Sequence, residues 1–203
     1  MSQRAILLAN RLNLQTAFKS EEPIKQIKNA EDLFRELLER SSCSNLLICD
    51  DEEKGHSCFI KNTYGIGSDK VFSVRNRNHK EVCLIHIDGV LFPKKKSKCD
   101  CVLFSENEFF FVEFKSNAAN KTEVARETEY EKCYNQLLST VDEFDRRYSK
   151  IGDDYRNRFK KVCAFAVFNP TVPRTNASQT NLRRKFSKKV HMDLQFTNKS
   201  KIG

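Results

Sequence analysis

The chain has 203 residues, enough for one compact domain with a hydrophobic core. Hydrophobic residues make up 39% of it and charged residues 31%, which excludes a disordered chain. No apolar run approaches the ~20 residues of a membrane span, and no signal layout follows the apolar patch 5–9, so we expect a cytoplasmic protein. The net charge of +9 favours a polyanionic partner, because phosphate contacts dominate nucleic-acid affinity.

The cysteines indicate reduced thiols rather than a disulfide framework. The sequence has eight cysteines but no Cys-x-x-Cys pair. Cysteine acts as a small hydrophobe in apolar, strand-like runs, and such runs contain Cys83, Cys99, Cys101 and Cys163. The alternative is a zinc site built from Cys43, Cys49, His56 and Cys58, although the spacings of these residues match no standard zinc pattern.

The first forty residues predict helices. One or two short helices are expected within 1–28, and an amphipathic helix is expected over 29–40, with Asn29 as its N-cap. Its apolar face comprises Leu33, Phe34, Leu37 and Leu38. Taking about 100° per residue, Glu31 lies about 90° from the centre of that face and Glu36 about 130°.

Three apolar runs that follow predict strands, at 46–49, 71–74 and 81–92. The acidic run 50–55 is interpreted as a solvated surface turn rather than a metal site. In the third strand, Asp88 and Gly89 indicate a bend or bulge, and His86 is assigned to the polar side.

The central feature is the segment 99–115, which predicts two short apolar strands joined by a polar turn at 105–107. Asp100 opens the first strand, and Glu113 and Lys115 end the second. Side chains two apart in a strand share a face, so Glu113 and Lys115 point the same way, and a tight hairpin brings Asp100 beside them. Charged groups are rarely buried without a partner or a metal, and two converging carboxylates suit Mg²⁺.

The lysine beside this carboxylate pair would orient a water or hold a phosphate oxygen. The set therefore indicates metal-assisted hydrolysis of phosphodiesters. The simpler alternative is a salt bridge between Glu113 and Lys115, with Asp100 as a turn residue. A basic loop precedes the hairpin and would attract a phosphate backbone, unless it is an ordinary charged loop; its cations are Lys94, Lys95, Lys96 and Lys98.

The second half of the chain alternates helices and strands. A long helical pattern at 122–148 leads into a buried strand at 161–168, and this connection predicts parallel pairing with the second strand of the hairpin. The remaining expectations are a short basic helix at 152–160, a polar loop at 171–180, a basic helix at 181–190, a strand at 191–196 and a frayed tail at 197–203.

An Asp-led apolar hairpin that ends in Glu-x-Lys resembles the signature of the PD-(D/E)XK nucleases. The resemblance implies an α/β fold with a restriction-endonuclease-like core, in which helices flank a central mixed β-sheet. It also implies that Asp100 and Glu113 bind Mg²⁺, or Mn²⁺ as a substitute, that the Phe114 backbone carbonyl adds a ligand, and that Lys115 assists the attacking water. Cys99 stands where the superfamily's signature has a proline, a residue that is often missing in the superfamily.

Two assignments within this resemblance have rivals. Many superfamily members supply another acid from the first core helix, and Glu31 is the better placed candidate, with Glu36 second; a solvated acid in the first helical turn is the alternative. Asp88 rivals Asp100 as the metal-binding aspartate, but the strand of Asp100 runs directly into the Glu-x-Lys strand. Some branches add a Gln and a Tyr one turn apart on the next helix, whereas here Gln136 is followed by Thr140.

We therefore expect one domain over 1–203, with its core at about 29–168 and a basic helix and strand at 181–196. The expected function is that of a Mg²⁺-dependent endonuclease that favours DNA over RNA, and cleavage of both strands would favour a homodimer. Further contacts with the phosphate backbone of the nucleic acid are assigned to Arg183, Arg184 and Lys185. The alternative is a non-catalytic nucleic-acid-binding module or an interaction subunit with the same fold.

Overall fold

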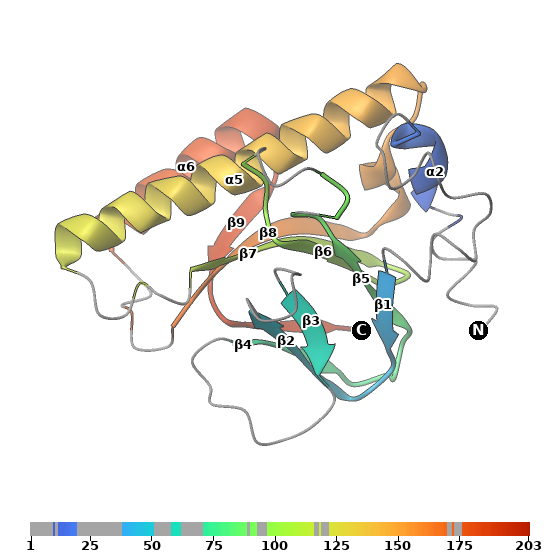
Figure 1. Ribbon diagram of the computed structural model, residues 1–203, viewed down its shortest axis with the longest axis horizontal. Coiled ribbons are helices and arrows are strands. Elements are labelled where there is room, and N and C mark those ends of the chain that lie inside the picture. Colours follow the sequence, from blue (N-terminus) through green and yellow to red (C-terminus); the bar gives the residue numbers. More distant parts are fainter. Residues whose placement is uncertain are drawn as a thin grey trace.

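Two β-sheets and a layer of helices make up the fold (Figure 1). The structure is a computed structural model that describes residues 10, 12–19, 38–50, 58–61, 71–88, 90–92, 97–115, 118, 122–169, 172 and 176–203. Within these residues the helices are α2 (Leu14–Ala17), α5 (Glu123–Lys150), the 3₁₀ helix η4 (Tyr155–Arg158) and α6 (Ala177–Val190).

The larger sheet has six strands in the order β1-β5-β6-β7-β8-β9. Strands β5, β6 and β7 form an antiparallel meander, while β7, β8 and β9 run parallel and are connected through α5 and α6. The predicted parallel pairing of 161–168 is therefore confirmed. The bounds are β1 (Leu38–Ser41), β5 (Val82–His86), β6 (Cys101–Phe104), β7 (Glu108–Lys115), β8 (Lys161–Phe168) and β9 (Asp193–Phe196).

The smaller sheet has four strands in the order β10-β4-β2-β3. It lies on the face of the larger sheet opposite to α5 and α6, so the larger sheet is the middle layer (Figure 1). The bounds are β2 (Asn45–Asp50), β3 (Cys58–Lys61), β4 (Val71–Asn76) and β10 (Lys199–Ile202).

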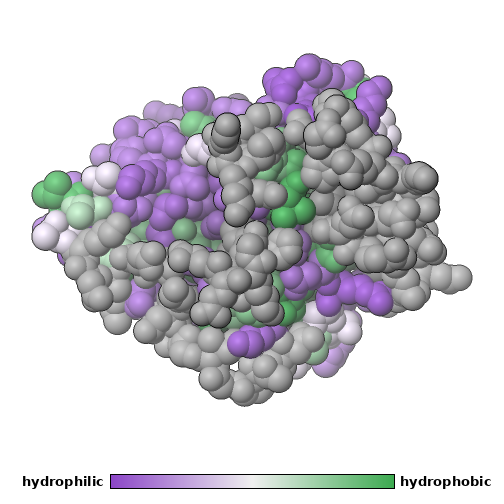
Figure 2. Space-filling model, viewed as in Figure 1, coloured by the Kyte–Doolittle hydropathy of each residue, from purple (hydrophilic) through white to green (hydrophobic). Residues whose placement is uncertain are grey.

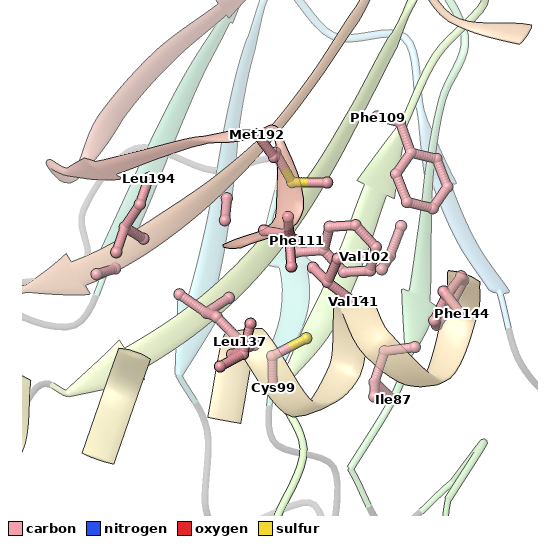
Figure 3. Close-up of a cluster of buried hydrophobic side chains, with 14 of the residues drawn as sticks. Ile87, Cys99, Val102, Phe109, Phe111, Leu137, Val141, Phe144, Met192 and Leu194 are labelled. Atoms are coloured by element: carbon pink, nitrogen blue, oxygen red, sulfur yellow. The ribbon is translucent and has the colours of Figure 1, made fainter. Parts of the chain in front are cut away.

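Strand β7 is apolar almost throughout because it lies in the middle layer, between the helices and the smaller sheet. Phe109 and Phe111 pack into the core on the helical side, whereas Phe110, Val112 and Phe114 pack into the core between the sheets. A strand covered on both faces needs apolar residues at successive positions. Figure 3 shows the core on the helical side, where side chains of α5 meet side chains of the sheet: Leu137, Val141 and Phe144 lie over Val102 and Phe111.

Helix α5 has clear local signals at both ends. The Thr122 side chain caps its first turn by accepting a hydrogen bond from the Ala125 N–H at 3.3 Å. Arg147 and Lys150 stand in its last turn, where cations complement the helix dipole. No helix in the described residues is long and apolar enough to cross a membrane.

Several predicted elements were wrong in type or extent. Residues 38–40, expected at the end of a helix, belong to β1, because they pair with β5; residues 29–37 lie outside the described part of the chain. The strand expected at 81–92 ends at His86, where the chain turns before an isolated bridge joins Asp88 and Phe92. Helix α6 begins at Ala177, within the expected loop, because Asn176 caps it. The expected helix at 152–160 is only the 3₁₀ turn η4.

The largest departure is the tail, which is paired rather than frayed. Strand β10 runs parallel to β4, and Ile202 is buried between the sheets. The Gly203 N–H also donates to Glu108 Oε1 at 3.2 Å.

His86 was assigned to a polar side, but it is buried, with its Nε2 3.1 Å from Glu39 Oε1. All eight cysteines are free thiols, as predicted.

Candidate active site

The hairpin formed by β6 and β7 brings the three predicted residues together at its open end. Its register pairs Cys101 with Val112, so Asp100 lies level with Glu113. Asp100 Oδ2 accepts a hydrogen bond from the Phe114 N–H at 2.7 Å. This bond fixes the Asp100 carboxylate at the end of β7, next to the side chains of Glu113 and Lys115.

Glu113 is the unusual member of this group, because it is a carboxylate with only 1% of its surface exposed. Its Oε1 accepts from the Lys115 ammonium. Its Oε2 is buried and receives no hydrogen bond within the described residues. A buried carboxylate oxygen without a donor costs free energy, since it has lost its water and gained no replacement. The orphaned oxygen belongs to the carboxyl group that faces Asp100.

The electrostatics of the pair favour an additional positive charge. Burial raises the pKa of Asp100 to about 7, against the hydrogen bond from Phe114. Burial and then the charge of Asp100 raise the pKa of Glu113 well above its usual range, although Lys115 opposes this. Burial alone would lower the pKa of Lys115, but the charge and hydrogen bond of Glu113 outweigh it and the net shift is upward. The two acids therefore retain a proton near neutral pH unless a cation replaces it.

Helix α5 supports this end of the hairpin. The Lys115 ammonium donates to Gln136 Oε1 at 2.7 Å, and the Gln136 amide donates to the Lys98 carbonyl at 3.1 Å. One turn later, Thr140 Oγ1 accepts from the Cys99 N–H at 2.8 Å. The pair Gln136 and Thr140 thus holds both Lys115 and the segment before Asp100. The signal in the sequence was the spacing of two hydrogen-bonding side chains one turn apart.

The other sequence-predicted residues are placed differently. Lys98 was assigned to phosphate binding, but it is buried, and its ammonium donates to the Ser139 carbonyl at 2.7 Å and to Ser139 Oγ at 3.0 Å. The Lys98 ammonium is thus held by α5, and its role in phosphate binding stays a prediction. Asp88 lies in the turn after β5, where its N–H approaches the Asp100 carbonyl at 3.4 Å. The acids Glu31 and Glu36 and the lysines Lys94, Lys95 and Lys96 lie outside the described residues, as does His56 of the alternative zinc site.

The basic residues of α6 lie in the helical layer. Arg184 and Lys185 are exposed, whereas Arg183 also donates from its Nε to the Leu194 carbonyl at 3.0 Å. These residues therefore stand away from the inter-sheet core and belong to the outer surface of the molecule. The hydrophilic surface of α5 and α6 is visible in Figure 2.

Sequence reasoning missed Asp50. It is the last residue of β2, it is half-buried, and its charge contributes to the raised pKa of Asp100. The smaller sheet therefore brings a third acid towards the hairpin. The acidic run that follows β2 obscured it, although Asp50 directly ends an apolar run in the same way that Asp100 opens one.

No family model, curated protein or solved structure matches the chain. In the part that the structure describes, no three His, Cys, Asp or Glu side chains are arranged to hold a metal ion by themselves. The Asp100 and Glu113 carboxylates are oxygen ligands of the kind that suits a hard divalent cation, and Glu113 Oε2 has no hydrogen-bond donor within the described residues. The fold and site define an α/β protein of mixed sheets, in which the buried Glu113 lies between the half-buried side chains of Asp100 and Lys115.

Proposed function

We propose that the protein is a metal-dependent nuclease that hydrolyses phosphodiester bonds, and that it acts as a DNA endonuclease. The observation that carries this proposal is the buried Glu113 Oε2, which has no hydrogen-bond donor in the described residues and faces a second carboxylate. A site that binds nothing would gain stability by replacing one of these acids. The arrangement is accounted for when a cation completes it.

Each residue has a role in this proposal. Asp100, Glu113 and the Phe114 backbone carbonyl would hold Mg²⁺ or Mn²⁺. The bound cation would polarise a phosphoryl oxygen and lower the pKa of a water molecule. Lys115 keeps its ammonium beside the carboxylates, where it would orient that water and stabilise negative charge on the phosphate. Gln136 positions Lys115 by accepting one of its hydrogen bonds at 2.7 Å.

The order of elements supports a restriction-endonuclease-like core. A meander of β5, β6 and β7 is followed by α5 and by the parallel strand β8. This is the order that the resemblance to PD-(D/E)XK nucleases implies, with Glu-x-Lys at the end of the last strand of the meander. The fold-family assignment remains part of the proposal.

A nucleic-acid substrate is supported by the charge of α6. This helix contains no acidic residue, and it exposes four cations in its second half: Arg184, Lys185, Lys188 and Lys189. Phosphate contacts from such a helix would position a strand without reading its sequence.

The test is cleavage of linear, circular and single-stranded DNA and of RNA, with and without Mg²⁺ or Mn²⁺. We expect divalent-dependent cleavage of DNA that falls about 100-fold or more in Asp100→Asn and Lys115→Met, because each removes a charge from the reacting centre. The matched control is Glu106→Gln, an exposed acid in the turn of the same hairpin. Cleavage that persists unchanged in both site variants would end the proposal.

The alternative is a non-catalytic nucleic-acid-binding module. It is favoured by the direct ion pair of Glu113 with Lys115, which fits a purely structural role. In that case the protein would bind DNA in a salt-sensitive way, and no divalent ion would support hydrolysis.

A further inference from the structure

The ion pair of Lys115 with Glu113 places a positive charge inside the candidate active site. The ammonium donates to Glu113 Oε1, and the side chains of Lys115 and Glu113 are only 18% and 1% exposed. Burial alone would lower the pKa of Lys115, but the charge of Glu113 outweighs burial and keeps this pKa above its usual range. The ammonium therefore stays charged, and one of the two acids already has a positive partner from the chain itself.

Two acceptors fix the position of this charge. Besides Glu113 Oε1, the ammonium donates to Gln136 Oε1 of α5 at 2.7 Å. The Gln136 amide in turn donates to the Lys98 carbonyl at 3.1 Å, so this acceptor is itself held in place. The charge of Lys115 is therefore built into the site, unlike that of a lysine whose long side chain moves freely in solvent.

A divalent cation bound by the two acids would face this fixed charge. Glu113 Oε2, which has no hydrogen-bond donor in the described residues, belongs to the same carboxyl group whose Oε1 binds Lys115. The other proposed ligand, Asp100, is fixed by the hydrogen bond from the Phe114 N–H at 2.7 Å. Like charges repel more strongly in a partly buried site than in water, so the ammonium and the cation oppose each other.

We propose that Lys115 is an internal counter-ion that opposes the binding of a divalent cation by Asp100 and Glu113. It neutralises one carboxylate when no divalent ion is bound, and it lowers the affinity of the two acids for such an ion. The protein therefore requires more Mg²⁺ or Mn²⁺ than the same pair of acids would without the lysine. This inference rests on the metal site of the proposed function, but it does not require hydrolysis.

The test measures Mn²⁺ binding without nucleic acid, from the electron paramagnetic resonance signal of the free ion. Lys115→Met and Lys115→Gln remove the ammonium, and the glutamine retains a donor for Glu113 Oε1. In water, an ammonium and a divalent cation about 4 Å apart repel by an amount that corresponds to about 30-fold in affinity. A competing proton carries half the charge of the cation and offsets half of this gain on a logarithmic scale. Both variants should therefore bind Mn²⁺ more tightly than the wild type, by about 5-fold or more.

Two controls separate the charge of Lys115 from other effects of substitution. Lys115→Arg keeps the positive charge and should bind Mn²⁺ as the wild type does. Lys132→Met is the matched control, because this lysine of α5 also pairs with a glutamate, Glu129, at 2.9 Å, but its side chain is 59% exposed. Solvent screens an exposed charge, so this variant should leave the affinity for Mn²⁺ unchanged.

The outcomes separate this inference from the proposed hydrolysis. Tighter binding in the neutral Lys115 variants alone, with folding intact by circular dichroism, supports it, and Lys115→Gln decides if Lys115→Met does not fold. Equal or weaker binding overturns it, and so does an equal gain in Lys132→Met, because net charge would then set the affinity. If the wild type cleaves with Mg²⁺ while the neutral variants bind Mn²⁺ no more tightly, only this inference fails. If none of the proteins binds Mn²⁺, the metal site of the proposed function fails with it.

Discussion

Asp100→Asn should stabilise the protein at neutral and alkaline pH in the absence of divalent ions. Asparagine can still accept the hydrogen bond from the Phe114 N–H, and its amide can donate to the orphaned Glu113 Oε2. It also removes the negative charge that, after burial, most strongly raises the pKa of Glu113. The variant thus replaces a repulsive pair by a hydrogen-bonded one, at the expense of the proposed metal site.

The magnitude follows from the raised pKa of Asp100. Burial shifts this pKa from 3.8 to about 7 on folding, and at about 1.4 kcal/mol per pKa unit the shift corresponds to about 4 kcal/mol. The folded protein binds the proton more tightly than the unfolded chain. The free energy of unfolding of the wild type should therefore fall as pH rises from about 4 to about 7. Because the Asp100 carboxyl is only half-buried, solvent and a high effective dielectric constant reduce the expected fall to about 2–4 kcal/mol.

The assay is urea unfolding at pH 5, 6, 7 and 8 in EDTA, for the wild type, Asp100→Asn and the control Glu106→Gln. The quantity compared is the difference between variant and wild type, which should grow in favour of Asp100→Asn as pH rises. Contacts with Cys58 and Glu39 raise the pKa of His86 to about 9, although burial opposes them. Protonated His86 therefore stabilises the folded protein, and this contribution is lost as pH rises from the ordinary pKa of 6.5 towards 9. This contribution is common to all three proteins and cancels.

Added Mg²⁺ or Mn²⁺ completes the experiment. At a concentration 100 times the dissociation constant, a ligand of the folded state alone adds about 2.7 kcal/mol to the wild type. The cation should add nothing to Asp100→Asn, which lacks one of the two carboxylates. The reasoning is refuted if Asp100→Asn is less stable than the wild type by the same amount at every pH, because the acids would then be ordinary stabilising groups.

Two further predictions test the surroundings of the site and the smaller sheet. Gln136→Leu removes a hydrogen-bond acceptor from the Lys115 ammonium, and a hydrogen bond to a charged group is worth about 1.5–3 kcal/mol. The kcat for DNA cleavage should therefore fall about 10- to 100-fold, with little change in KM. The control Asn135→Ala, at an exposed neighbouring position, should match the wild type. Ile202→Ala should lower the free energy of unfolding in urea by about 2–4 kcal/mol because Ile202 is buried between the sheets; a loss no greater than that of the exposed Lys199→Ala would show that β10 is not docked.

Strong local patterns made part of the structure predictable. The apolar alternation and polar turn of 99–115 specify a hairpin, and a hairpin register alone places Asp100 level with Glu113. The continuous apolar run at 161–168 and the long periodic helix before it define a parallel crossover. The hairpin depends on residues close together in the sequence, and the crossover follows from the rule for a helix that connects two strands of one sheet, which is why the sequence by itself determined them.

Tertiary pairing decided the elements whose local signals were weak or opposed. Leu38 to Arg40 end the predicted helix, yet with Ser41 they form β1 because they pair with the edge of β5. The polar tail becomes β10 because β4 pairs with it and the core between the sheets accepts Ile202. Several other strands or helices lie between each of these strands and its partner, so neither a hairpin nor a single crossover helix marks the pairing in the sequence.

The sequence by itself determined that Asp100, Glu113 and Lys115 would share the end of one hairpin. Only the tertiary structure decided what surrounds them: α5 takes up Lys98 and holds Lys115 through Gln136, and the smaller sheet brings Asp50 towards Asp100. The physical reason is that hairpin geometry is local, whereas burial and hydrogen-bond partners depend on which layers cover the sheet.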